Sequence, residues 1–148
     1  MSARQQALAT LRTRVQGILV AEGFQTNAGG LVFLAEKPHL GPDDPGEAIA
    51  IEVLPDEPGH QGEKVALTLP IAVQAIVKAD LDDPGMTVEA VIADIKNAVE
   101  TDHDLGGTLL PRGLERGVTA QLDREDGSTF VGAAVGYRLR FTEDWGAP

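Results

Sequence analysis

Apolar residues recur at helical spacing in two parts of the 148-residue chain. Spacings of three and four positions are the period of one helix face, so each stretch predicts an amphipathic helix. The first stripe is Leu8, Leu11, Val15 and Ile18. The second stripe is Val88, Val91, Ile92, Ile95 and Val99. We expect the first helix to begin near Gln5 and to stop at Gly23, and we expect Thr87 to cap the start of the second.

Between these helices the apolar positions alternate with polar ones, which predicts strands. The cleanest run has an apolar residue at every odd position and consists of Val65, Leu67, Leu69, Ile71, Val73, Ala75 and Val77. A strand of that length would span about 40 Å. We therefore expect it to bend or bulge near Pro70, whose missing N–H favours an edge position. Shorter strands are predicted at 31–36 and around 49–53.

The C-terminal third alternates in the same way. Val118, Ala120 and Leu122 predict one strand, and Asp126-Gly127 is a signal for a tight hairpin turn. The returning strand would carry its apolar residues on one face, namely Val131, Ala133, Val135, Tyr137, Leu139 and Phe141. Its opposite face would carry Gly132, Gly136, Arg138 and Arg140.

Proline and glycine mark two loops between the strands, at 37–47 and 55–62. Strands that cluster between two helices, without regular alternation of strand and helix, are typical of an α+β fold. We expect a largely antiparallel sheet with two helices packed on one face and a C-terminal β-hairpin. The length and the 43% hydrophobic content predict a single domain over residues 1–148.

Charge is divided sharply along the chain. Residues 36–104 contain 16 Asp and Glu and all four lysines, whereas all eight arginines lie outside that interval with seven acids. The net charge of the whole chain is −11. A protein this acidic cannot neutralise phosphates by counterion release, so stable nucleic-acid binding is not expected.

Most catalytic and cofactor-binding machinery is missing from the sequence. There is no cysteine, no P-loop and no glycine-rich dinucleotide fingerprint. Ser128 has no nucleophile elbow around it, and His39, His60 and His103 are isolated in predicted loops. The chain also lacks a signal-peptide-like start and a run long enough to span a membrane, so we expect a soluble, untargeted protein.

Two acidic loops resemble calcium-binding sequences only superficially. When Gly85 is aligned with the turn glycine of an EF-hand, Pro84 takes a ligand position and Val91 replaces the bidentate glutamate. The stretch 123–127 fails in the same way, although a weak divalent site shared between subunits stays an alternative. We therefore expect no metal, no cofactor and no enzymatic activity.

The order of elements over nearly the whole length resembles the tail terminator (minor tail protein U-like) family of long-tailed bacteriophages. The resemblance rests on the first helix near Gln5, the acidic strand-rich middle and the second helix. It also rests on Asp104-Leu105-Gly106-Gly107 and on the closing strand Tyr137-Arg138-Leu139-Arg140-Phe141 with its short tail, Trp145-Gly146-Ala147-Pro148. The loops at 37–47 and 55–62 have no match in that pattern.

The resemblance implies a virion protein that assembles in the host cytoplasm into a homo-hexameric ring. That ring would cap the head-proximal end of the tail tube and stop its polymerisation. Its partners would be the major tail tube protein and the head-tail connector protein, and DNA would pass through the lumen without specific binding. The alternatives are a head-completion or neck protein of the same virion and a small cytosolic metal-dependent enzyme on the same layout.

A closed ring needs two different, complementary patches on each subunit. The separated arginines and the acids of 36–104 are candidate partners across such a contact. We single out Arg112, Arg116, Arg138 and Arg140 as interface residues. The division of charge predicts that the acids face the passing DNA while the arginines, on a different surface, meet protein.

Overall fold

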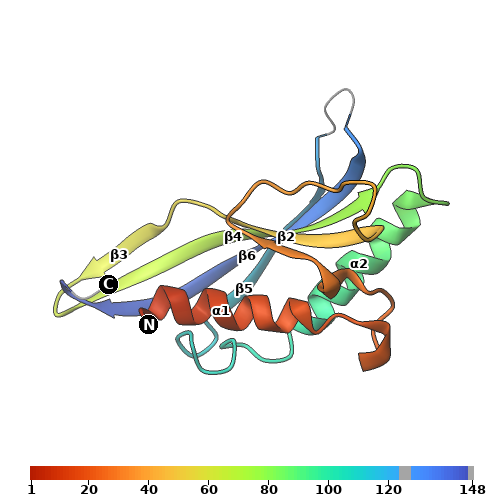
Figure 1. Ribbon diagram of the computed structural model, residues 1–148. Coiled ribbons are helices and arrows are strands. Elements are labelled where there is room, and N and C mark those ends of the chain that lie inside the picture. The colour runs from red at the N-terminus through yellow and green to blue at the C-terminus, as the bar shows by residue number, and fades with distance from the viewer. Residues whose placement is uncertain (124–127, 147–148) are drawn as a thin grey trace.

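The structure is a computed structural model, and it describes residues 1–123 and 128–146. Its sheet carries both long helices on one face (Figure 1). The elements in chain order are α1 (Ala3–Gln16), η1 (Val20–Glu22), η2 (Ala28–Gly30), β1 (Val32–Leu34), β2 (Glu47–Val53), β3 (Glu57–Gln61), β4 (Lys64–Lys78), α2 (Pro84–Val99), β5 (Leu114–Gln121) and β6 (Phe130–Asp144). The predicted α+β class is confirmed.

The six strands form one sheet in the order β1-β2-β4-β6-β5, and β3 pairs with β4 beyond the end of β2. Only β1 and β2 are parallel, and every other pair is antiparallel. The last two strands form the predicted C-terminal hairpin. Its expected turn at Asp126-Gly127 lies outside the described residues.

The main core lies between the helices and one face of the sheet, which we call the helix face. Strand side chains alternate between faces, so the odd-numbered residues of β4 and β6 point to the helix face. The residues of β4 that are buried in this core are Leu67, Leu69, Ile71, Val73, Ala75 and Val77. They meet the stripe predicted for α2 and the residues Ala7, Leu11 and Val15 of α1. The predicted face of β6 is likewise buried from Ala133 to Phe141.

Helix α1 starts and stops at short local signals. Ser2 and Gln5 form a capping box, in which each side chain accepts a hydrogen bond from the other residue's backbone N–H. The helix ends at Gln16 with Gly17 as its C-cap. Our prediction of Gly23 as the stop was therefore wrong. Gly23 instead ends the short η1 turn, where its φ of 94° suits a glycine.

Helix α2 begins earlier than predicted. Its N-cap is Asp83, whose side chain accepts from the N–H of Met86, and Pro84 takes the first helical turn. Proline suits that position because its missing N–H is one of the donors that a helix start leaves unpaired. Thr87 is inside the first turns of the helix and is not its cap.

Strand β4 runs unbroken through Pro70. Its pairing with β6 keeps one register from Lys64 opposite Asp144 to Lys78 opposite Phe130, so the expected bulge is absent from this ladder. The carbonyl of Pro70 accepts from the N–H of Leu54, on the side of β4 that faces β2 and β3. A residue's N–H and C=O point to the same side of a strand. The N–H that Pro70 lacks would therefore have pointed between the end of β2 and the start of β3.

Part of the second predicted loop, at 55–62, is a strand. Residues Glu57–Gln61 form β3, which pairs with β4 through Thr68, Leu67 and Val65 and is exposed along its whole length. The loop at 37–47 agrees with the prediction up to Glu47, where β2 begins. Figure 1 shows β3 and the adjoining ends of β4 and β6 reaching beyond the helices.

Candidate interaction surface

Three of the four candidate arginines lie on the face of the sheet opposite the helices, which we call the outer face. Arg138 and Arg140 are at even positions of β6 and so point away from the helices. Arg112 lies beside them, because its carbonyl accepts a hydrogen bond of 2.9 Å from Nη2 of Arg140. Arg116 pairs in register with Tyr137 and belongs to the helix face.

Two of these arginines form ion pairs within their own chain. Nη2 of Arg138 contacts a carboxylate oxygen of Glu57 at 2.5 Å, which joins β6 to β3 across β4. Nε of Arg116 lies 3.1 Å from Oε1 of Glu100, just after α2. Both arginine side chains are substantially exposed, so each pair contributes on the order of 0–1 kcal/mol.

Glu100 also receives a hydrogen bond of 2.7 Å from the hydroxyl of Tyr137. The ring of Tyr137 is buried in the main core, and its hydroxyl reaches the partly exposed Glu100 at the edge. Burial raises the pKa of Tyr137 above its ordinary value of 10.0, and the hydrogen bond to Glu100 raises it further. Tyr137 therefore stays a neutral donor, and Glu100 is shared between it and Arg116.

The division of charge along the sequence becomes a pattern of cross-pairing in the fold. Every ion pair of the described residues joins a group inside 36–104 to a group outside it. These pairs are Arg4–Asp56, Arg14–Asp102, Lys64–Asp144, Arg116–Glu100 and Arg138–Glu57. Arg4, Arg14, Arg116 and Arg138 contact acids of 36–104 directly, so these four arginines do not lie on a surface separate from the acids.

The outer face has one covered end and one open region. At the covered end the loop after β1 places Leu40 in a second apolar cluster, with Phe33, Ala48, Ala50 and Ile76. The sequence pattern did not predict this cluster, because Ala48 and Ala50 fall at the positions expected to be solvent-facing. The open region consists of small and polar residues at outward-facing positions, among them Ala72, Gln74, Ala134 and Gly136.

Strand β5 is an exposed edge of the sheet. Residues 115–121 are all exposed, and Val118 has 78% of its surface accessible. The alternation of Val118, Ala120 and Leu122 predicted the strand correctly but did not mark a buried face. The register against β6 shifts between Arg116 and Thr119. Such an irregularity twists an edge and discourages uncontrolled strand pairing.

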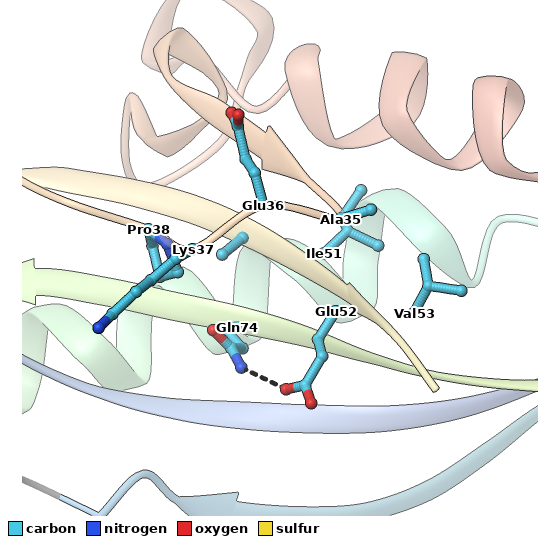
Figure 2. A pocket seen from close by; sticks show the side chains of 9 residues that line it. Ala35, Glu36, Lys37, Pro38, Ile51, Glu52, Val53 and Gln74 are labelled. Carbon is cyan, nitrogen blue, oxygen red and sulfur yellow. Dashed lines mark hydrogen bonds between the residues drawn. The ribbon is translucent and has the colours of Figure 1, made fainter. Parts of the chain in front are cut away.

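A groove of about 290 Å³ lies at the opposite side of the sheet, between β2 and the chain that leaves β1 (Figure 2). We call it the β2 groove; it is lined by Ala35, Glu36, Lys37, Pro38, Ala50, Ile51, Glu52, Val53 and Gln74. Oε2 of Glu52 accepts a hydrogen bond of 2.9 Å from Nε2 of Gln74. Ala35 bends the chain over the groove with a φ of 56°, and its N–H binds the carbonyl of Ile51.

Residues 1–123 and 128–146 contain no group of three or more His, Asp or Glu that could hold a metal ion. The histidines are exposed, and the ring of His39 lies 5.3 Å from that of Phe33. Of the two acidic loops, the first supplies the cap Asp83, and 124–127 of the second lie outside the described residues.

No protein-family model matches the chain, and no curated protein matches its sequence. In the part of the chain that the structure describes, the helices are too short or too polar for any of them to cross a membrane.

Proposed function

We propose that the protein is a structural subunit of a long-tailed bacteriophage virion. Copies of it form a hexameric ring that caps the head-proximal end of the tail tube, stops its polymerisation and receives the head connector. The order of elements that carries the resemblance to tail terminators is compatible with the observed α+β fold. The proposal depends on the subunit's architecture.

One observation supports the proposal most. The sheet is open, and its two ends are unlike: β1 with the β2 groove lies at one end, and the exposed strand β5 lies at the other. A closed ring requires two different patches on each subunit, each matching the other. An open sheet with unlike ends on an outer face of small and polar side chains provides such patches.

The charge of the subunit fits a conduit for DNA. Among the described residues, Arg14, Arg116 and Arg138 lie within hydrogen-bond distance of an Asp or Glu, and Arg4 lies 3.5 Å from Asp56. A subunit of net charge −11 cannot displace many counterions from a DNA duplex, so counterion release contributes little binding free energy. DNA would therefore pass such a ring without adhering to it.

Two measurements test the proposal. Native mass spectrometry and electron microscopy of the purified chain should show hexameric rings with a lumen wide enough for duplex DNA. When the protein is added to polymerising tail-tube subunits from the same virion, the tubes should become shorter. Monomers throughout the micromolar range, with no ring on the tubes, would overturn the proposal. Rings that leave tube length unchanged but restore head joining would identify a head-completion protein instead.

A further inference from the structure

Arg112 differs from the other candidate arginines in that its side chain is free. The described residues include no hydrogen-bond or ion-pair partner of its guanidinium. Its backbone is nevertheless held firmly. Arg140 donates to the carbonyl of Arg112, and the N–H of Gly113 binds the carbonyl of Leu110 at 2.7 Å.

The backbone of Arg112 is also strained, since its φ is 56°. The left-handed region is unfavourable for a residue that carries a side chain. The side chain of Arg112 is exposed, and no acid among the described residues pairs with it, so its guanidinium is available to a partner.

The β2 groove contains a carboxylate that suits such a side chain. Glu52 is exposed, and only its Oε2 is engaged, by Gln74. Planar guanidinium groups bind carboxylates in a two-point geometry, and their aliphatic stems pack on apolar surface. Ala35 and Pro38 supply that surface. The charges of Glu36 and Lys37 offset one another, and Figure 2 shows both side chains extending away from Glu52.

Arg112 and the β2 groove lie at opposite ends of the same face. Arg112 is held by Arg140 on the outer face near β5, whereas Glu52 and Gln74 lie on that face near β1. A single subunit therefore cannot bring the two together. Copies related by rotation about a ring axis can, because a heterologous contact joins one end of a subunit to the other end of its neighbour.

We infer that Arg112 of one subunit inserts into the β2 groove of a second copy and binds the carboxylate of Glu52. This inference rests on the proposed ring and names one of its contacts. Arg138 and Arg140 are less suitable, because their guanidinium groups already contact Glu57 and the carbonyl of Arg112. Arg116 is excluded from this contact by its place on the helix face.

A charge exchange tests the contact. Native mass spectrometry at a series of protein concentrations measures the concentration at which rings dissociate. We expect Arg112→Glu and Glu52→Arg each to raise it by about tenfold or more, since close interfacial charge pairs couple strongly. The double variant, which restores opposite charges with their places exchanged, should bring it back to within about threefold of the original protein.

Two variants control for net charge. Arg12→Glu on α1 changes the charge as Arg112→Glu does, and Glu89→Arg on α2 matches Glu52→Arg; both positions are exposed. Neither should change the concentration at which rings dissociate, and circular dichroism should show that every variant is folded.

If neither Arg112→Glu nor Glu52→Arg changes that concentration, the inference is overturned but the proposed function still stands. Single variants that weaken the ring without rescue in the double variant exclude Arg112 as the occupant. A wild-type chain without rings contradicts the proposed function itself.

Discussion

Arg14 and Asp102 form a two-point ion pair that joins the C-terminal ends of the two helices. Nη1 and Nη2 of Arg14 donate to the two carboxylate oxygens of Asp102 at 3.0 and 2.9 Å. Nη1 also donates to the carbonyl of Val99, which ends α2. Asp102 accepts a further hydrogen bond from the N–H of Gly106. One arginine therefore connects α1, the last turn of α2 and the loop that follows it.

Replacement of Arg14 by leucine should lower the free energy of unfolding by about 1–2 kcal/mol. The Arg14 side chain is 18% exposed and Asp102 39%, so solvent screens the pair in part, but a buried stem and the Val99 carbonyl add to its loss. Urea unfolding followed by circular dichroism measures the change. Arg12→Leu, at an exposed position of the same helix, should stay within about 0.5 kcal/mol.

The same pair predicts a pH dependence. The hydrogen bond from Arg14 is the main cause that lowers the pKa of Asp102 below its usual 3.8. A lowered pKa in the folded state stabilises the protein above the unfolded-state pKa and loses that effect as the pH falls through the folded-state pKa. Stability should therefore fall more steeply below pH of about 4 in the original protein than in Asp102→Asn. If stability fell equally steeply below a pH of about 4 in the two proteins, Asp102 would not be a source of the acid sensitivity.

Asp94 holds the segment between α1 and β1 against α2. It is 2% exposed, and its carboxylate accepts from the N–H groups of Gln25 and Thr26 and from Oγ1 of Thr26. Asp94→Ala would leave these donors without an acceptor and should cost about 3 kcal/mol in the free energy of unfolding. Asp94→Asn keeps one acceptor oxygen and should cost less. Glu89→Gln, exposed on the same helix, is the matched control for urea unfolding.

Much of the fold could be predicted from the sequence because its main elements each bury one face. The odd positions of β4 and β6 and the stripe of α2 had to be apolar to meet in one core, so their periodicity is visible in the chain. Strand β3 buries neither face and contains Pro58 and Gly59. Its pairing comes from backbone hydrogen bonds to β4, and such bonds leave no pattern in side-chain type.

The candidate surface was less predictable for a related reason. Arg138 and Glu57 are 81 positions apart, and the sequence gives no sign that β3 extends along β4 to bring them together. Once paired, Arg138 is a weaker candidate for an interface than its exposed position suggested. The β2 groove depends on the loop that follows Ala35. Ala35 has a positive φ, and because it is not a glycine the sequence does not indicate this bend. Only the fold distinguishes Arg112 from its neighbours.

Tyr137→Phe should cost about 1 kcal/mol in the free energy of unfolding, because it removes the hydrogen bond to Glu100 but keeps the buried ring. The raised pKa of Tyr137 also predicts a loss of stability at high pH. Its contribution is complete below the unfolded-state pKa of about 10 and falls as the pH rises above it. Thermal unfolding between pH 8 and 11 should show a shallower decline for Tyr137→Phe. An unchanged alkaline slope would assign that decline to other groups.

Gly132 is required by the close approach of β6 to its neighbours. A Cβ added there would lie 2.4 Å from the carbonyl oxygen of Ala75 on β4 and 2.9 Å from Cδ1 of Leu122. The first neighbour is backbone within a continuous ladder, so it cannot move without disturbing the register of the two longest strands. Gly132→Ala should therefore lower the free energy of unfolding by about 2–3 kcal/mol, measured by urea unfolding.

Gly85→Ala is the control, since nothing lies within 4 Å of its added Cβ and the site is helical. It should leave stability unchanged or raise it by up to about 1 kcal/mol. Equal effects at the two glycines would show that loss of backbone freedom, and not the contact with Ala75, determines the cost.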